Sequence, residues 1–179
     1  LTRNVRDLDR YLTKTGFDTI VVEYLGRGHE HFQDEIHRLF QWMGLQRREF
    51  PPPKSRCFSM RPWDNFFWWI ELDEMPTRSM VVPVHWPPES GVRPVLTKAE
   101  VRQRNRLMVT TGAGQITVWL SPDMVNFDDR ITITVNGRAH RNPEGATPDT
   151  AVLLEDVRTR GDRQHPFWAK VKLRNARRR

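Results

Sequence analysis

The first 44 residues alternate between helical and extended patterns of apolar positions. Apolar residues recur every three or four positions in residues 4–14, which predicts an amphipathic helix that ends before Gly16. Residues 19–24 contain three consecutive β-branched apolar residues, as is typical of a strand covered on both faces in a parallel sheet. A second helical stripe runs through residues 31–43 and is expected to end at Gly44. Because a single strand of this kind needs neighbours, this segment predicts part of a larger α/β sheet.

The pattern changes after the triplet Pro51-Pro52-Pro53. Three fixed φ angles favour an extended spacer, so we expect residues 1–50 to form one domain, residues 51–62 a proline-rich linker and residues 63–179 a second domain. The second domain is predicted to be an antiparallel β-sandwich with one short helix at residues 151–157. Its predicted strands are residues 66–72, 79–86, 104–111, 115–120, 131–136 and 168–173. A tight hairpin is predicted at Gly112-Ala113-Gly114, and a primed turn is predicted at Asn136-Gly137.

Composition and charge narrow the function classes. The chain has 179 residues, 37% of them hydrophobic, and a formal net charge of +7, so it is expected to fold. Residues 158–179 hold nine lysines or arginines against one acid, Asp162, and this balance of +8 leaves −1 for the rest of the chain. A basic tail without aromatic residues interleaved does not favour nucleic-acid binding. Cys57 is the only cysteine, so no disulfide framework is predicted, and no membrane span or signal peptide is recognisable.

The richest candidate chemistry lies in residues 23–32, Glu-Tyr-Leu-Gly-Arg-Gly-His-Glu-His-Phe. A strand that leads through two glycines to a histidine and then to a helix places that histidine at the edge of a sheet, where side chains reach a cleft. This segment resembles the histidine loop of α/β-hydrolases, especially the prolyl oligopeptidase-like and dienelactone hydrolase-like branches. Leu25 stands where that loop often has proline. The resemblance covers about residues 2–44, including the order of helix, strand, turn and helix.

The resemblance implies that His29 is the general base of a serine hydrolase. A Gly-x-Ser-x-Gly nucleophile elbow is absent from the sequence, and the family places both the serine and the acid upstream of the histidine. The chain starts with Leu1 rather than methionine, so we expect the serine and the aspartate to lie in a preceding region and this fragment to be inactive alone. The alternative interpretation of His29 is a turn residue without chemistry.

Other clusters are better explained without a ligand. His29, His31, Glu35 and His37 are close in sequence but lack the spacing of a zinc helix, so no metal is predicted. Alternation over residues 66–72 predicts that Phe66, Trp68, Ile70 and Leu72 share one face and that Phe67 and Trp69 share the other, for packing rather than sugar stacking. The charged residues between 155 and 163 are expected to organise a structural corner.

The sequence therefore predicts an α+β chain. It would comprise the last helix, strand and helix of an α/β-hydrolase sheet, followed by the β-sandwich. The expected function is the C-terminal part of a bacterial serine peptidase or esterase, which supplies His29 and an accessory β-sandwich and uses no cofactor. Its expected partners are the missing catalytic region, in the same polypeptide or as a cleaved chain, and a peptide or ester substrate; self-association through an open sheet edge is a further expectation. The alternative is a non-catalytic binding or interaction module. Export to the periplasm or the medium stays open.

Overall fold

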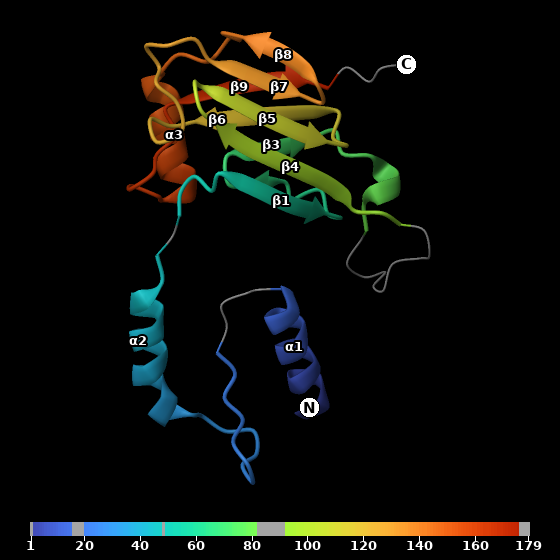
Figure 1. Cartoon of the computed structure of the whole chain (residues 1–179), viewed down its shortest axis with the longest axis vertical. Coiled ribbons are helices and arrows are strands. Elements are labelled where there is room, and N and C mark those ends of the chain that lie inside the picture. The colour runs from blue at the N-terminus through green and yellow to red at the C-terminus, as the bar shows by residue number, and fades with distance from the viewer. Residues whose placement is uncertain (1, 16–19, 48, 82–91, 176–179) are drawn as a thin grey trace. The chain divides into compact units, whose positions relative to one another are not determined.

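The computed structural model describes residues 2–15, 20–47, 49–81 and 92–175, in two compact units. The units are Leu1–Arg47 and Arg48–Arg179. Helices dominate the first unit, and two mostly antiparallel sheets dominate the second (Figure 1). The protein is therefore α+β, and its sheets are consistent with the expected β-sandwich.

The first unit contains the predicted helices but no strand among its described residues. Its elements are α1 (Thr2–Thr15), a 3₁₀ turn η1 (Gln33–Glu35) and α2 (Ile36–Leu45). The second helix continues through Gly44 to Leu45, two residues past the predicted span 31–43, and η1 replaces its expected first turn. Within the predicted strand 19–24, residues 20–24 are described and join no β-ladder. A strand needs a hydrogen-bonded neighbour, and the described part of this unit offers none.

The first unit has no buried side chain among those described, residues 5–14 and 20–47. Large apolar side chains stay in solvent: Leu25 is 85% exposed, Leu45 78% and Phe40 64%. Isolated exposed apolar residues are ordinary, but the described side chains of this unit lack full burial, which is the main source of folding free energy.

The second unit contains a five-stranded sheet with the strand order β1-β4-β5-β7-β8. Its strands are β1 (Lys54–Ser59), β4 (Val95–Arg102), β5 (Arg106–Thr111), β7 (Thr132–Val135) and β8 (Arg138–Arg141). All neighbours are antiparallel except β5 and β7, which run parallel. The sequence predicted β5 and β7 but not β4 or β8, and β1 occupies part of the expected linker. The proline triplet interrupts only the residues before Lys54, after which the backbone is free to pair.

A four-stranded sheet with the order β2-β3-β6-β9 faces it. Its strands are β2 (Phe66–Phe67), β3 (Ile70–Asp73), β6 (Gln115–Leu120) and β9 (Ala169–Arg174). The strands predicted at residues 115–120 and 168–173 are confirmed as β6 and β9. In the predicted strand 79–86, Ser79 instead belongs to the 3₁₀ turn η2 (Thr77–Ser79), Met80 and Val81 join no ladder, and residues 82–86 lie outside the described residues.

The predicted strand 66–72 is wrong, because the chain reverses in its middle. Phe67 pairs with Ile70, and Trp68 adopts a φ of 60° in the turn between β2 and β3. Side chains alternate between the two faces of a sheet only along a continuous strand, so the predicted assignment of these residues to two faces is also wrong. Trp69, predicted on the face opposite Ile70 and Leu72, is buried together with them.

The Gly112–Gly114 turn was predicted to close a hairpin, but it carries the chain from one sheet to the other. The strands on either side, β5 and β6, have no pairing with each other. The amide of Gly114 donates to the carbonyl of Glu74, and a Cβ on Gly114 would lie 2.8 Å from Oε2 of Glu74. The predicted turn at Asn136-Gly137 is confirmed: φ angles of 47° and 86° match the primed type and join β7 to β8.

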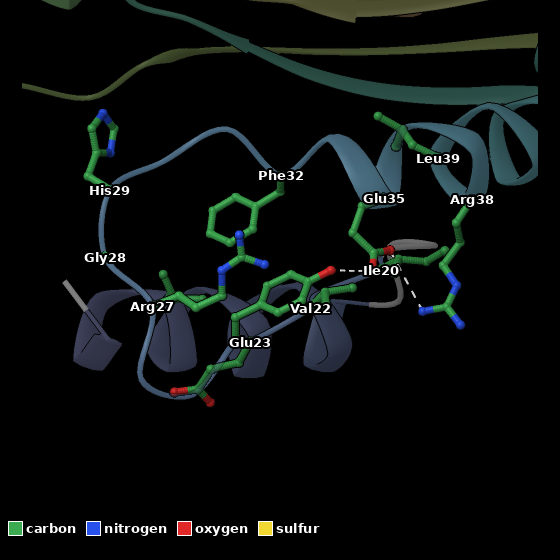
Figure 2. Close-up of a pocket in the computed structure, with 12 residues that line it drawn as sticks. Ile20, Val22, Glu23, Arg27, Gly28, His29, Phe32, Glu35, Arg38 and Leu39 are labelled. Atoms are coloured by element: carbon green, nitrogen blue, oxygen red, sulfur yellow. Dashed lines mark hydrogen bonds and ion pairs between the residues drawn. The ribbon is translucent and has the colours of Figure 1, made fainter.

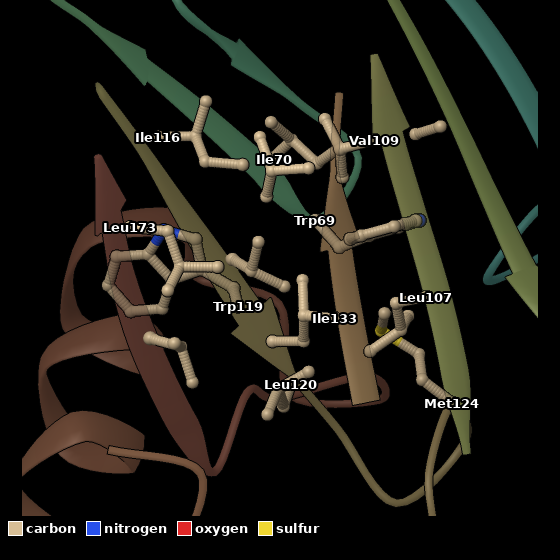
Figure 3. Close-up of a cluster of buried hydrophobic side chains, with 14 of the residues drawn as sticks. Trp69, Ile70, Leu107, Val109, Ile116, Trp119, Leu120, Met124, Ile133 and Leu173 are labelled. Carbon is tan, nitrogen blue, oxygen red and sulfur yellow. The ribbon is translucent and has the colours of Figure 1, made fainter. Parts of the chain in front are cut away.

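The core lies between the inner faces of the two sheets (Figure 3). Alternation is strict in β7 and β9, where the apolar positions are buried and the polar positions are half-buried or exposed. All six residues of β6 are buried. On its second face Trp119 donates from Nε1 to Glu71 and packs against Phe66 and Phe167. This strand is therefore covered on both faces.

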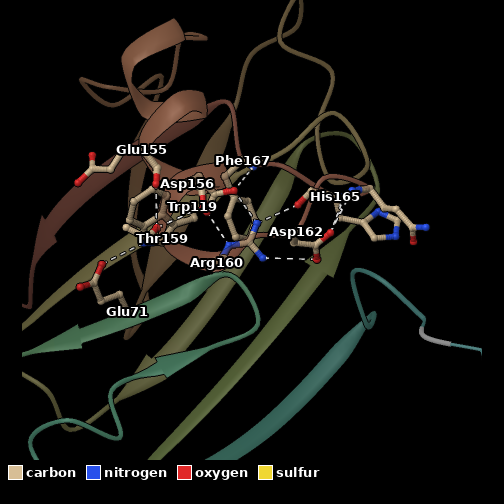
Figure 4. Close-up of polar contacts among 10 residues, drawn as sticks. Glu71, Trp119, Glu155, Asp156, Thr159, Arg160, Asp162, His165 and Phe167 are labelled. Carbon is tan, nitrogen blue, oxygen red and sulfur yellow. Dashed lines mark hydrogen bonds and ion pairs between the residues drawn. The ribbon is translucent and has the colours of Figure 1, made fainter.

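Helix α3 (Thr150–Arg160) is fixed by a buried carboxylate (Figure 4). Asp149 caps its start by accepting from the amide of Ala151, and Gly161 ends it with a φ of 67°. Asp156, 2% exposed, accepts from Nε and Nη2 of Arg160 at 2.5 and 2.6 Å and from the amide of Phe167 at 2.9 Å. The Arg160 guanidinium also lies over the Phe167 ring and donates to the carbonyl of His165.

The charged residues around 155–163 thus form the structural corner that the sequence indicated, with Asp156 and Arg160 at its centre. Asp162 adds a second carboxylate 3.7 Å from Arg160 and accepts from the amides of Gln164 and His165. The bonds from the Phe167 amide to Asp156 and from Arg160 to the His165 carbonyl, with the Arg160–Asp162 ion pair, join α3 to the segment leading into β9, so the corner positions the last strand.

We expect Asp156→Ala to lower the free energy of unfolding by about 3–5 kcal/mol, because it leaves a largely buried guanidinium without its partner. Urea denaturation followed by tryptophan fluorescence measures this loss. The matched control is Glu155→Ala, which removes an exposed ion pair with Lys170 and is expected to cost no more than about 1 kcal/mol. Equal losses in the two variants would contradict the role given to Asp156.

Candidate functional site

The predicted turn at Gly26-Arg27-Gly28-His29 links the extended residues 20–24 to η1 and α2. Gly26 has a φ of +75°, a conformation that favours glycine, and a Cβ there would meet no atom within 4 Å. Glycine is therefore favoured at position 26 by the backbone conformation, not by a lack of room for a side chain. His29 follows the turn and is exposed.

Two aromatic rings brace the turn from both sides (Figure 2). Tyr24, which precedes the turn, stacks on Phe32, which follows it, with ring centroids 4.8 Å apart and planes 15° apart. The Arg27 guanidinium lies 5.5 Å from the Tyr24 ring and 5.1 Å from the Phe32 ring, within reach of a cation–π interaction. The Tyr24 hydroxyl donates to Glu35. Sequence reasoning assigned no role to this brace, although the eight-residue separation of two aromatics around a glycine turn was a usable signal.

Ion pairs complete the turn. Arg27 donates to both carboxylate oxygens of Glu30 at 2.7 and 2.9 Å, and Arg6 of α1 donates to Glu23 at 3.0 Å. The hydrogen bond from Arg27 lowers the pKa of Glu30. The hydrogen bond to Glu35, followed by partial desolvation and the negative charge of that carboxylate, raises the pKa of Tyr24. Each partner therefore favours the protonation state that keeps the brace together at neutral pH.

A cleft of about 620 Å³ opens beside the brace. Its apolar wall comes from α1, the extended segment and α2, and its polar edge from the turn. The residues that line it include Val5, Ile20, Val22, Phe32, Leu39 and His29. Such a mainly apolar hollow with a few polar groups suits either a ligand or another protein surface.

The structure does not assemble a complete catalytic group around His29. The imidazole ring points away from Phe32 and Glu35 (Figure 2), and within the described chain it forms no hydrogen bond or ion pair. Residues 1–47 contain neither serine nor cysteine. A general base needs a nucleophile to deprotonate and a third group to orient its ring, and neither group contacts His29 among the described residues of this unit.

The neighbouring histidines are not gathered around an ion. The described residues include no group of three or more side chains that could hold a metal. His31 lies before η1 and His37 lies on α2, and both are exposed.

Among the helices of the described segments, none combines the length and apolar character needed to cross a membrane.

Comparison with known protein families, with curated proteins and with solved structures finds no match to this chain. The relation to α/β-hydrolases therefore stays a prediction from residues 2–44.

We expect Glu35→Gln to lower the midpoint of Tyr24 ionisation, since the substitution removes a negative charge and weakens the hydrogen bond to the neutral phenol. The chain has two tyrosines, Tyr11 and Tyr24, so a Tyr11→Phe background isolates the signal. Tyrosinate absorbance near 295 nm over an alkaline titration gives the midpoint. The control Glu49→Gln removes an exposed carboxylate far from the turn in sequence. An identical midpoint in both variants would contradict the hydrogen bond between Tyr24 and Glu35.

Proposed function

We propose that residues 1–47 supply the general base, His29, to a serine hydrolase of the peptidase or esterase type. The serine and the acid would come from a catalytic region encoded in the same reading frame, either in the same polypeptide or as a chain cleaved from it. The observation that carries this proposal is an exposed, unpartnered histidine on a braced glycine turn, in a unit whose described apolar side chains are all left unburied.

Exposure of the apolar side chains supports a covering partner. Helices α1 and α2 and residues 20–24 present stripes of apolar residues that the sequence pattern assigns to a sheet interior. Burying such surface stabilises by roughly 25 cal/mol per Å². A catalytic α/β region that covered these stripes would give residues 20–24 the strand neighbours they lack.

The brace supports a catalytic geometry for the turn. Stacking of Tyr24 on Phe32 and the bond from Tyr24 to Glu35 tie the segments before and after His29 together. A base must be held within hydrogen-bond reach of its nucleophile throughout the reaction. The brace fixes the backbone, and the acid of the covering region would orient the ring.

In such an enzyme the imidazole of His29 accepts the serine proton as the hydroxyl oxygen attacks the ester or amide carbonyl. It then donates that proton to the leaving alcohol or amine, which leaves the acyl group bonded to the serine. A water molecule, deprotonated by the same imidazole, attacks this acyl group, and the serine takes the proton back as the carboxylic acid product is released. This chemistry needs no metal or organic cofactor.

The test uses the polypeptide encoded by the complete reading frame that contains this chain. We expect its hydrolysis of p-nitrophenyl esters or peptide p-nitroanilides to lose at least about a hundredfold in kcat/KM with His29→Ala, the usual scale for a general base. The matched control is His31→Ala, an exposed histidine two residues away, which is expected to keep kcat/KM within about twofold.

A fluorophosphonate probe adds an independent readout, because it labels activated serines directly. Labelling of the complete polypeptide, reduced by His29→Ala and retained in His31→Ala, supports the proposal. Neither labelling nor turnover in the complete polypeptide, or full turnover in His29→Ala, refutes it.

A further inference from the structure

The outer face of the five-stranded sheet carries an unusual arrangement of charge. Residues paired directly across neighbouring strands point to the same face, and this rule defines the outward set from the strand registers. Its charged members are Lys54, Arg56, Lys98, Glu100, Arg102, Arg106 and Arg141. This outer face of the second unit therefore carries six cations and one carboxylate.

The cations form two rows across the strands. One row pairs Arg56 of β1 with Lys98 of β4. The other pairs Arg102 of β4 with Arg106 of β5 and continues through Thr132 of β7 to Arg141 of β8. Because the rows cross the sheet, they are built from strands distant in sequence, and the charge run of the C-terminal tail plays no part in them.

The single carboxylate neutralises only part of this charge. Glu100 lies 2.8 Å from Arg102 and 3.8 Å from Lys54, and the hydrogen bond from Arg102 lowers the pKa of Glu100. Arg56, Lys98, Arg106 and Arg141 form no ion pair with any residue in the described segments. Arg56 and Lys98 stand opposite each other as like charges, a placement that destabilises a sheet and that a bound anion relieves.

A groove of about 380 Å³ lies on this face along the first row. Its lining includes Arg56, Lys98, Glu100, Met108 and Thr110. Thr134 follows Met108 in the same cross-strand line, and Ala139 follows Thr134. The line of residues between the two rows therefore carries no charge past Glu100 of β4, with the Thr134 hydroxyl between flanking cations, an arrangement that suits an extended anionic polymer.

We propose that this face binds an acidic polysaccharide, a chain of sugars that carry carboxylate or sulfate groups. The arginine forks and Lys98 bind the acidic groups by charge-assisted hydrogen bonds, and the threonine hydroxyls bond to sugar hydroxyls. Single-stranded nucleic acid fits less well, because binding without base pairing relies on aromatic platforms. Phe58 is the one outward aromatic residue of strands β1, β4, β5, β7 and β8, and the Arg56 guanidinium lies 5.1 Å from its ring centroid.

The site is independent of the proposed hydrolase function, since it uses no residue of the first unit. Loss of catalysis in His29→Ala therefore says nothing about polysaccharide binding, and loss of this binding says nothing about His29.

The experiment compares two charge-reversal variants of the whole chain. Lys98→Glu/Arg106→Glu changes both rows, and Lys172→Glu/Arg174→Glu makes the same change of net charge at exposed positions of β9 in the other sheet. The probes are polygalacturonate for carboxylates, chondroitin sulfate for sulfates, neutral dextran, and oligothymidylate of similar length. Isothermal titration calorimetry at low and physiological salt gives the affinities, and circular dichroism checks the fold of each variant.

We expect the wild-type chain to bind at least one acidic polysaccharide, more weakly as salt rises, and not to bind dextran. The first variant is expected to lose at least about tenfold in affinity and the second less than about threefold. If charge reversal unfolds the first variant, neutral substitutions replace both charge-reversal variants: Lys98→Gln/Arg106→Gln and Lys172→Gln/Arg174→Gln. We again expect the first of these to lose more affinity than the second. Equal losses in both variants, tighter binding to oligothymidylate than to either polysaccharide, or no acidic polysaccharide bound at low salt would each overturn the proposal.

Discussion

The rest of the second unit depends on the coverage of β6 on both faces. One face of the strand packs into the core between the sheets, and on the other Trp119 is closed off by Phe66, Phe167 and the corner built on Asp156. That corner places a charged group in the interior, which is tolerated because Arg160 and the Phe167 amide satisfy it. The first unit has no comparable strand among its described residues. Its apolar stripes remain open among those residues, and this contrast between the units underlies the proposal that a catalytic region covers the first unit.

Most of the correct predictions came from the alternation of apolar and polar residues along strands and from residue types typical of turns. Residues 131–136 alternate cleanly and end in Asn136-Gly137, so strand, face and turn all follow from local sequence. Local reasoning failed where a single backbone angle decides the path, as at Trp68, whose φ of 60° turns one predicted strand into two. It also failed at the Gly112–Gly114 turn, because a short glycine turn looks the same whether the next strand pairs with the last one or crosses to the facing sheet.

For the candidate site, the sequence indicated an exposed His29 after a glycine turn, but the described residues contain no strand at whose edge it was expected to lie, and the sequence did not indicate what supports the turn. An exposed histidine after a glycine turn follows from the order of elements and from glycine's conformational freedom. The stacking of Tyr24 on Phe32 and the bond to Glu35 depend on how the segments fold back, which no local pattern encodes. The charged rows on the outer sheet face were equally hidden, since they exist only through strand register.

The parallel pairing of β5 with β7 has a consequence for how the chain acquires its structure during synthesis. After β5 is made, the polypeptide leaves for the facing sheet, lays down β6, and returns to β5 only at residues 132–135. One edge of β5 thus stays unpaired until more than twenty further residues have been added, while β4 already covers its other edge. Contacts of this separation form late, and an open edge is the place where a nascent strand pairs with a wrong partner. The arginine that begins β5, Arg106, puts a charge on that edge throughout this interval.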